Sequence, residues 1–482
     1  MWLILRGAQR IILSPQVVER HSDSPSSYSL DTVSQLDRDA STALITIRKW
    51  RNSFAPINRI PSDVLSLFAT HLPSQKDRFY ATHVCRHWRR TFLQYGTLWS
   101  QLILRNDEAY VKTILERAKG SSLDLTIDRC FPIDGVRILL SPHSQQVRYL
   151  RYVSRENALK SLNSFPFQQL TTFELSARAT NESESDLFNF LKASPMLRTV
   201  KLRITGATIP GNNPRESIVV LPNVETFLLE VTNGRSVFDL AAQISCPRSR
   251  DTSIEKNMSA LTVPSSQTIF PPRSLLNSIT HQYMRNPVEE VTLEVGTLGC
   301  SLTFRSFDRS TIRFGCILFC LDPGEFSREV LSGASRTIWA HPQLPYIKRL
   351  SIKYWHRVVI LDASQVAHVA REVERLFRSM KPLDELTIEG WDLRVFPAPF
   401  LHPEEPVRPN VFPQIKRLVI LRPVMEGNEE ECMEAIVELA KYQHAKGMPF
   451  ERVTVRASAV PAAVAERLAR WVGVVDCYED QK

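Results

Sequence analysis

The residues best placed to do metal chemistry in this sequence lie close together at His83, Cys85 and His87. On a helix, His83 and His87 would share one face, because residues four apart lie one turn above each other. Two such ligands do not complete a four-coordinate zinc site, and the positive charge of Arg86 between them would repel a cation. We therefore interpret the two histidines as surface residues beside a packed cysteine, and the sequence predicts no metal site.

The sequence lacks the short motifs of several enzyme classes. No two of its 16 glycines are separated by a single residue and none precedes a lysine, which excludes the dinucleotide-binding fingerprint and the phosphate-binding P-loop. No two glycines are four apart, which excludes the nucleophile elbow of hydrolases. No histidine precedes a glutamate, which excludes the zinc helix of metalloproteases. The sequence therefore predicts no catalytic residue and no cofactor.

Composition places the chain among ordinary globular proteins. Its 482 residues correspond to about three domain-sized units, and 43% hydrophobic with 23% charged residues is a typical globular balance. No apolar run approaches the ~20 residues of a membrane-spanning helix, and Arg6 interrupts the apolar start before a signal-peptide core forms. The eight cysteines are scattered without a Cys-x-x-Cys pair, which suits a reducing compartment. We expect a cytoplasmic or nuclear protein without a membrane partner.

The chain is moderately basic. Its 60 Lys and Arg against 51 Asp and Glu give a net charge of +9, but no block of five or six like charges appears and no nucleic-acid-binding motif is present. A charge of this size over so long a chain favours a solubility bias, or steering of an acidic protein partner, over direct binding of nucleic acid.

A stretch of about fifty residues, 55–104, predicts a small helical module. Pro61 suits the first turn of a helix, and Pro73 ends that helix. A second helix is predicted from Gln75, with Arg86, Arg89 and Arg90 facing away from its apolar side. The apolar stripe of the first helix is Val64, Leu65, Phe68 and Leu72, and that of the second is Ala81, Val84, Cys85, Trp88 and Phe92. So small a module cannot bury all of this surface by itself, so part of it is expected to face a partner.

This module resembles an F-box. The resemblance rests on Ile60-Pro61, Asp63-Val64-Leu65, Leu67-Phe68, Val84-Cys85, Trp88-Arg89 and Leu98-Trp99, which follow the family's order. Ile60 stands where leucine is commoner, Asp63 where glutamate is, and Phe79 and Tyr80 occupy usually aliphatic places.

The resemblance implies docking on the Skp-family adaptor of a cullin–RING ubiquitin ligase, by amphipathic helices packed into a groove. It implies no catalytic role, because the family brings a substrate protein to catalytic subunits. The adaptor-binding residues that it implies are Pro61, Val64, Leu65, Phe68, Val84, Cys85 and Trp88.

Downstream, one short pattern recurs nine times: an apolar residue, two mostly polar residues, an apolar residue, any residue and an apolar residue. Seven copies follow a proline by one or two residues, which predicts entry into an extended segment. The copies begin at Val147, Leu170, Leu197, Val224, Val288, Ile347, Leu383, Ile415 and Phe450.

The pattern resembles the strand of a leucine-rich repeat, in which each unit adds one strand to a parallel sheet and returns through a helix or an irregular segment. We predict returning helices at Glu184–Lys192, Ser364–Met380 and Glu429–Lys446. Successive copies are 23, 27 and 27 residues apart and later 32 to 64, and the asparagine of true repeats is missing. The first interpretation is therefore an irregular α/β solenoid, and the alternative is a less regular α/β sheet.

The predicted organisation has four parts. Residues 1–30 are expected to be disordered, residues 31–54 to form a helix preceding the F-box-like module at 55–104, and residues 120–482 to form the leucine-rich-repeat-like α/β domain. Two stretches rich in proline or small polar residues, 232–287 and 396–413, are expected to be insertions.

Three functions are compatible with the sequence. The favoured hypothesis is a substrate-recognition subunit that recruits an unknown protein substrate to a ubiquitin ligase. The second is an F-box scaffold that binds the adaptor without directing degradation, and the third is an enzyme or nucleic-acid binder that lacks a short motif. The sequence identifies no substrate-binding residue, although basic residues on the repeats leave recognition of a phosphorylated partner open.

Overall fold

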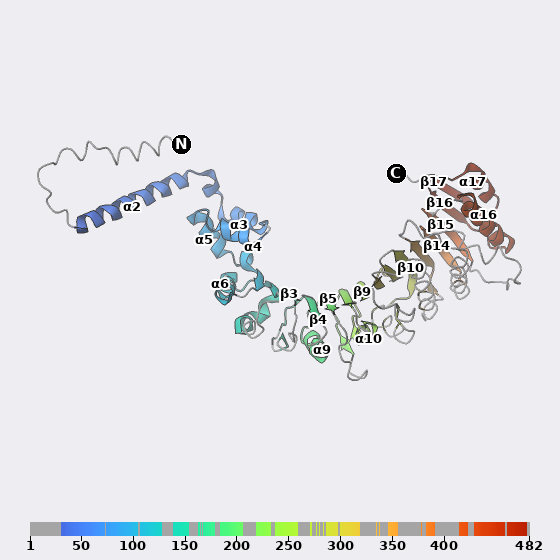
Figure 1. Ribbon diagram of the computed structural model, residues 1–482, viewed down its shortest axis with the longest axis horizontal. Coiled ribbons are helices and arrows are strands. Elements are labelled where there is room, and N and C mark those ends of the chain that lie inside the picture. The colour runs from blue at the N-terminus through green and yellow to red at the C-terminus, as the bar shows by residue number, and fades with distance from the viewer. Residues whose placement is uncertain are drawn as a thin grey trace. The chain divides into compact units, whose positions relative to one another are not determined.

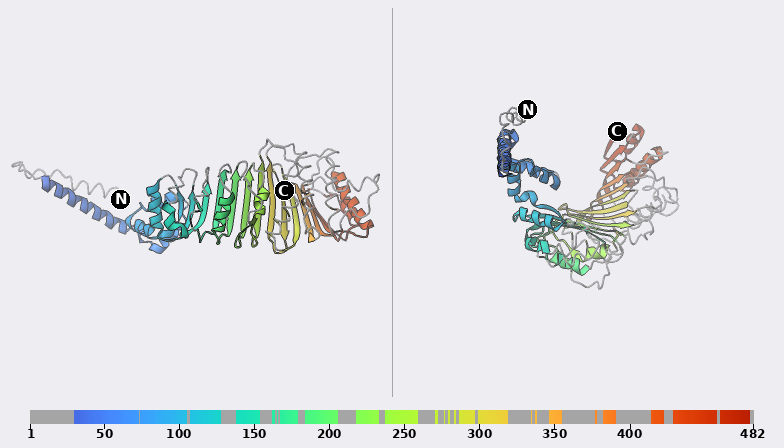
Figure 2. Two further views of the ribbon diagram at one scale, coloured as in Figure 1. Left: turned by 90° about the horizontal axis from the view of Figure 1, so that it is seen from below. Right: turned by 60° about the vertical axis from the view of Figure 1, so that its left-hand side comes forward.

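In the computed structural model, the fourth and sixth positions of all nine copies of the apolar pattern lie on strands of one 15-stranded sheet. The fold is mixed α/β, and the strands lie side by side in a single row (Figures 1 and 2). The order along the sheet is β1-β2-β3-β4-β5-β7-β9-β12-β11-β10-β13-β14-β15-β16-β17. Every neighbouring pair is parallel except the two pairs that involve β11.

The structure describes residues 30–72, 74–104, 107–127, 138–153, 162–163, 165, 167–178, 184–205, 218–232, 237–258, 270–271, 276, 279, 283, 286–296, 299–318, 334, 337, 346–354, 377, 382–390, 414–422, 429–457 and 460–479. These residues belong to two compact units, a helical unit, Met1–Leu98, and a sheet unit, Trp99–Lys482.

The strands of the sheet are β1 (Gln101–Leu104), β2 (Leu123–Ile127), β3 (Val147–Val153), β4 (Thr172–Arg178), β5 (Thr199–Thr205), β7 (Thr226–Thr232), β9 (Asp251–Met258), β10 (Val288–Gly296), β11 (Gly299–Ser306), β12 (Thr311–Leu318), β13 (Arg349–Tyr354), β14 (Leu383–Glu389), β15 (Ile415–Leu421), β16 (Arg452–Ala457) and β17 (Val474–Glu479). Two short strands, β6 (Val219–Val220) and β8 (Ile244–Ser245), pair with each other in a separate two-stranded sheet.

Equivalent positions of the pattern stand next to each other across the sheet. In one half, the fourth positions of successive copies are register partners, and they are Leu150, Phe173, Val200 and Phe227. In the other half, the same position forms the row Val291, Leu350, Leu386, Leu418 and Val453. All of these side chains are buried, and each contributes about 1.5–3 kcal/mol relative to an exposed position.

Helices cover the buried side of this sheet, and α6, α9 and α10 lie on its outer, convex side (Figure 1). Aromatic pairs join the two layers: the Phe173 and Phe190 ring centroids are 4.4 Å apart, and those of Phe238 and Phe314 are 6.2 Å apart. The helices of the sheet unit are α6 (Glu108–Ala118), α9 (Glu184–Lys192), α10 (Val237–Ala242), α16 (Glu429–Ala445) and α17 (Ala462–Leu468), with a 3-10 turn at η4 (Ser141–Gln146).

Helix α6 illustrates how these elements form. Asp107 caps its first turn by accepting a hydrogen bond from the backbone N–H of Tyr110 at 2.9 Å. The buried residues Val111, Ile114, Leu115 and Ala118 recur at helical spacing, so the helix buries one face. The chain leaves the helix through Gly120, whose φ of +77° is one that glycine adopts without steric cost.

The centre of the sheet departs from a simple series of parallel strands. The chain passes from β9 to β10, which lies three positions further along the sheet, and the intervening places are filled by β11 and β12, which return toward β9. Strand β9 lies within the stretch 232–287, which was predicted to be an insertion. The pattern missed β9 because two of its buried positions are Thr252 and Lys256, neither of them an apolar residue.

The helical unit contains α2 (Leu30–Ser53), η2 (Pro56–Arg59), α3 (Ser62–Thr70), α4 (Gln75–Ala81), α5 (Arg86–Gln94) and η3 (Gly96–Trp99). The second helix predicted from Gln75 is two helices, because Cys85 is extended, with φ −159°, and its Sγ accepts the backbone N–H of Trp88 as the N-cap of α5. Arg78 is buried and donates from Nη1 to the carbonyl oxygen of Leu98 at 3.0 Å. This bond ties α4 to the end of the unit.

Several predicted boundaries can be compared with the structure. Helices α9 and α16 agree with the two returning segments predicted near them, and α2, which ends at Ser53, covers the helix predicted over 31–54 except its last residue. The two units divide after Leu98, earlier than residue 104, because Leu102 and Leu104 alternate with exposed residues on β1, which pairs with β2. The disordered segment predicted over 1–30 lies outside the described residues except Leu30, which is the first residue of α2 and so is helical. The insertion at 396–413 also lies outside them, as does the helix predicted over 364–380 except Phe377, which is helical and buried.

Among the residues that the structure describes, no helix combines the length and the hydrophobicity needed to cross a membrane.

Candidate functional site

One side of α3 exposes a cluster of large apolar side chains. Val64, Leu67 and Phe68 are 48%, 64% and 62% exposed. They are spaced at i, i+3 and i+4, so they share one face of the helix. The opposite face holds Leu65 and Ala69 in the core of the unit. We refer to Val64, Leu67 and Phe68 as the α3 face.

The seven residues implied as adaptor-binding divide into two groups in the structure. Pro61, Val64, Phe68 and Val84 are exposed, and Cys85 is half-buried. Leu65 and Trp88 are 1% and 7% exposed, and Trp88 stacks edge-on against Phe92 with ring centroids 5.5 Å apart. Leu65 and Trp88 therefore hold the unit together from inside, whereas the exposed group is available to another molecule. Leu67 was not among the seven, although its spacing from Val64 and Phe68 was visible in the sequence.

The histidines near Cys85 have structural partners. His87 Nε2 donates to the carbonyl oxygen of Ile60 at 3.0 Å, and His83 Nδ1 accepts from Arg89 at 3.4 Å. His83 lies in the turn between α4 and α5 and His87 on α5, so the two do not share a helix face. Within the described part of the chain, no group of three or more His, Cys, Asp or Glu residues is arranged to hold a metal ion.

A cleft of about 430 Å³ lies between the second half of α2 and the start of α5. Its walls are mixed in character, with three basic side chains and no acidic one. It is lined by Ile45, Arg48, Lys49, Asn52, Ser53, Cys85, Arg86 and His87.

The face of the sheet opposite the buried rows is polar. Thr172, Thr199 and Thr226 are register partners on three adjacent strands. Two residues further along the strands, charged residues pair across the sheet, and Lys201 Nζ lies 2.8 Å from Glu174 Oε1. Arg203 Nε lies 2.9 Å from Glu230 Oε2 in the next row. We refer to this surface as the polar sheet face.

Glu174 is held ionised by its neighbours. Burial by itself would raise the pKa of Glu174, but hydrogen bonds from Lys201 and Tyr149 outweigh it and lower the pKa. Burial together with the Glu174 carboxylate raises the pKa of Tyr149 to about 12. The strands β3, β4 and β5 are therefore joined by one polar network.

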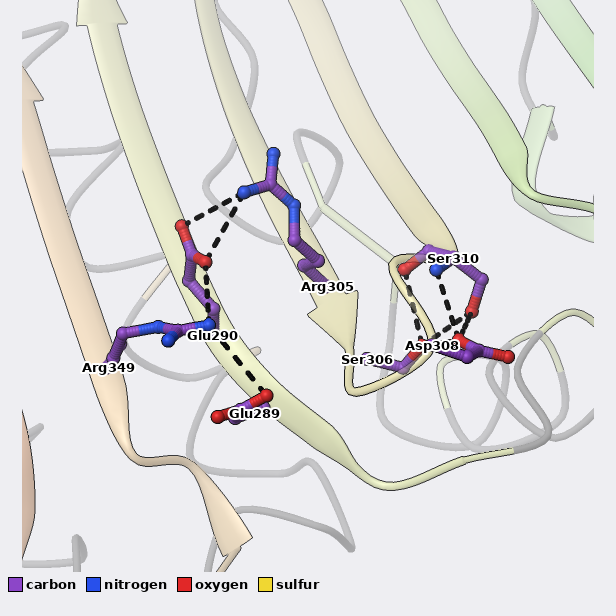
Figure 3. Close-up of polar contacts among 7 residues, drawn as sticks. All are labelled: Glu289, Glu290, Arg305, Ser306, Asp308, Ser310 and Arg349. Atoms are coloured by element: carbon purple, nitrogen blue, oxygen red, sulfur yellow. Dashed lines mark hydrogen bonds and ion pairs between the residues drawn. The ribbon is translucent and has the colours of Figure 1, made fainter.

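Charges alternate in sign across five adjacent strands. Glu290 on β10 lies between Arg305 on β11 and Arg349 on β13, with Nη1–Oε2 at 3.3 Å and Nη2–Oε2 at 3.4 Å (Figure 3). The row continues with Glu385 on β14 and Arg417 on β15, whose closest N–O distance is 3.7 Å. The five residues are three Arg and two Glu, and each Glu lies between two Arg, so the row presents paired charges with a small basic excess.

The turn between β11 and β12 contains a carboxylate surrounded by hydroxyl donors. Asp308 accepts from the Ser306 hydroxyl, from the Ser310 hydroxyl at 2.8 Å and from the Ser310 backbone N–H at 3.1 Å (Figure 3). These bonds, the one from Ser306 first, lower the pKa of Asp308 to about 2. Because the hydrogen bonds favour the charged form, Asp308 stabilises the turn whenever it is ionised.

This turn should make the sheet unit sensitive to acid. The folded-state pKa of Asp308 lies below its ordinary value of 3.8, so its stabilising effect is complete above about pH 4 and is lost as the pH falls toward 2. Asp308→Asn should be less stable than the wild type at pH 7 and should lose less stability between pH 4 and pH 2. Urea unfolding at pH 7, 4, 3 and 2 measures this, and parallel pH curves for the two proteins would contradict it.

The described surfaces thus include an exposed apolar helix face on the helical unit and a polar sheet face on the sheet unit. No protein-family model matches the chain, and no curated protein matches it.

Proposed function

We propose that this chain is the substrate-recognition subunit of a Skp–cullin–F-box ubiquitin ligase, acting in the cytoplasm or nucleus. The helical unit docks on the Skp-family adaptor as an F-box, and the sheet unit, an irregular leucine-rich-repeat-like solenoid, recruits a protein substrate. The chain has no catalytic role in this proposal.

The observation that carries the proposal is the α3 face. Three large apolar side chains stand about half or more exposed on a nine-residue helix, within a unit whose opposite helix face is already buried. Contiguous exposed apolar side chains of this kind mark interaction sites. They stand at positions of the F-box-like motif, which supports an adaptor as the partner.

The polar sheet face supports the recruiting role. It is formed by residues from many adjacent strands, so a bound protein would contact a surface composed of residues far apart in the sequence. The charges on this face favour a bound protein whose own charges are complementary to them. A bound protein with a like charge at one of these positions would be repelled, and this gives selectivity.

Co-purification of the full chain with a Skp-family adaptor tests the docking. Leu67→Asp/Phe68→Asp places two charges in the α3 face and should weaken adaptor binding at least about tenfold, since central apolar anchors carry most of the energy of such an interface. Thr70→Asp is the matched control, because Thr70 is exposed on the same helix outside the α3 face, and it should bind as the wild type does.

Two results would overturn the docking assignment. One is a wild-type chain that fails to retain the adaptor, and the other is a Leu67→Asp/Phe68→Asp chain that retains it as well as Thr70→Asp does. Circular dichroism of each variant, matching that of the wild type, establishes that the helical unit is folded in the comparison.

A further inference from the structure

The polar sheet face changes character over its last three strands, β15, β16 and β17. Three positions on each of these strands point to this face, and they are register partners from one strand to the next. Their side chains are exposed or half-buried. The residues are Arg417, Val419 and Leu421 on β15, Arg452, Thr454 and Arg456 on β16, and Val474, Asp476 and Tyr478 on β17. We refer to these residues as the C-terminal patch.

The C-terminal patch combines apolar side chains with arginines. Val474 and Tyr478 are 43% and 50% exposed, and Val419 and Leu421 are half-buried. Tyr and Arg are enriched among the residues that carry most of the binding energy of protein interfaces, and the centres of such interfaces are rich in apolar side chains. The composition of the C-terminal patch is therefore that of a protein-binding surface.

The corresponding surface at the centre of the sheet has a different composition. On β11, β10 and β13 every position of the equivalent three rows is charged or carries a hydroxyl group. The residues are Arg305, Thr303 and Ser301, then Glu290, Thr292 and Glu294, then Arg349, Ser351 and Lys353. The apolar residues of the C-terminal patch are thus a local feature and not a general property of the polar sheet face.

The alternation of charge along the sheet ends inside the C-terminal patch. Arginine and glutamate alternate in one row from β11 to β15, but Arg417 on β15 and Arg452 on β16 are register partners. Like charges directly opposite each other on adjacent strands are destabilising. A carboxylate placed between the two guanidinium groups would remove this repulsion and accept charge-assisted hydrogen bonds from both.

The acidic neighbours of the two arginines leave both side chains accessible. Arg417 Nη1 lies 3.7 Å from Glu385 Oε2, and Arg452 Nε lies 3.5 Å from Asp476 Oδ2. These distances exceed the length of a good hydrogen bond, and the two arginine side chains are 49% and 55% exposed. Exposed ion pairs of this kind contribute little to stability, and each guanidinium group carries five N–H donors. Both arginines can therefore bind a carboxylate of another molecule.

A third arginine makes the C-terminal patch basic. The guanidinium carbon of Arg456 lies 5.9 Å from the centroid of the Tyr478 ring, within the range of a cation–π contact. Three arginines against Asp476 give the patch an excess of two positive charges. Charge complementarity therefore favours an acidic occupant.

We propose that the C-terminal patch binds an acidic segment of the protein that the sheet unit recruits. Carboxylates of this segment bridge Arg417 and Arg452, and its apolar side chains pack on Leu421 and Tyr478. The inference rests on the recruiting role proposed for the sheet unit and adds the chemistry of the partner. The patch favours a protein over a single-stranded nucleic acid, because such nucleic acids stack successive bases on several aromatic rings and Tyr478 is the one aromatic residue of the patch.

Selection of peptides from a random displayed library against the full chain tests the chemistry of the partner. We expect the selected peptides to combine Asp or Glu with apolar residues. Fluorescence anisotropy should show that they bind Arg417→Gln/Arg452→Gln at least about tenfold more weakly than the wild type, because both bridging arginines are lost. Circular dichroism of the variant should match that of the wild type, since both replaced side chains are about half exposed.

Arg305→Gln/Arg349→Gln is the matched control. It removes the same charge from two arginines of the same row, outside the C-terminal patch, and it should bind the selected peptides as the wild type does. Three results would overturn the proposal: selected peptides without acidic residues, equal loss of binding in the two double variants, or a single-stranded oligonucleotide that displaces the peptides and binds more tightly than they do.

Co-purification with the Skp-family adaptor separates this inference from the ligase proposal. Arg417→Gln/Arg452→Gln should retain the adaptor as the wild type does, because the α3 face is unchanged. A wild type that retains the adaptor but selects no acidic peptide overturns the role of the C-terminal patch alone. A wild type that selects acidic peptides at the patch but does not retain the adaptor overturns the docking assignment alone.

Discussion

Replacing Phe173 by alanine should lower the free energy of unfolding of the sheet unit by about 3–5 kcal/mol, the usual cost of truncating a buried aromatic side chain. Phe173 is fully buried on β4, and its ring lies 4.4 Å from that of Phe190 on α9. The truncation therefore removes contacts between the sheet and its covering helix and leaves a cavity that the neighbouring strands cannot close.

Denaturant unfolding followed by circular dichroism measures this effect. Phe307→Ala is the matched control, because Phe307 is 77% exposed in the turn between β11 and β12, and it should change the stability by less than about 0.5 kcal/mol. Equal losses in the two variants would show that the row through Leu150, Phe173 and Val200 is not the structural core of the sheet.

Replacing Trp88 by alanine should destabilise the helical unit by a similar amount, about 3–5 kcal/mol. Trp88 is 7% exposed and packs edge-on against Phe92, so the change opens a cavity inside a small unit whose core has few other large residues. Helix content, tryptophan fluorescence and protease resistance of residues 30–98 should all decrease in the full chain at room temperature.

Phe68→Ala is the control for Trp88→Ala. Phe68 is 62% exposed, so its truncation should change the stability of the unit by no more than about 0.5 kcal/mol while weakening adaptor binding. A Trp88→Ala chain as stable as Phe68→Ala would contradict the burial of Trp88. The two variants also separate two causes of lost adaptor binding. A loss in Trp88→Ala follows from unfolding of the helical unit, whereas a loss in Phe68→Ala follows from the removal of a side chain of the α3 face.

The spacing of apolar residues in the sequence was sufficient to locate much of the sheet. Nine apolar hexads predicted nine strands, and within each half of the sheet their fourth and sixth positions are register partners. The reason is local. A strand that buries alternate side chains needs an apolar residue at every second position, so this spacing indicates the strand in the sequence. Helices α9 and α16 coincide with segments that were predicted to return the chain between copies of the pattern.

Strands without that pattern were not predicted. On β9 the buried positions include Thr252 and Lys256, and on β12 Ile312 and Phe314 lie in a stretch that no hexad marks. Strands β12 and β11 fill the two places between β9 and β10, which are far apart in the chain. The position of such a strand in the sheet depends on strands far away in the sequence, so the types of its own residues do not predict it.

The candidate site shows the same division. Spacing in the sequence identified the apolar residues of the F-box-like motif, including Leu65, Phe68 and Trp88, but an apolar stripe is equally consistent with a core and with an interface. Only the packing of α3 against α5 decided that Leu65 and Trp88 are inside and that Val64, Leu67 and Phe68 are outside. The extended Cys85 that separates α4 from α5 is likewise a tertiary outcome, since its N-cap geometry is not visible in the apolar spacing.

By itself, then, the sequence determined which segments have a core-facing side, because periodic burial requires periodic apolar residues. The tertiary structure decided which strands are neighbours, how Glu290 comes to lie between Arg305 and Arg349, and which apolar side chains remain on the surface. These are properties of contacts between residues far apart in the chain, and they arise only when the elements pack.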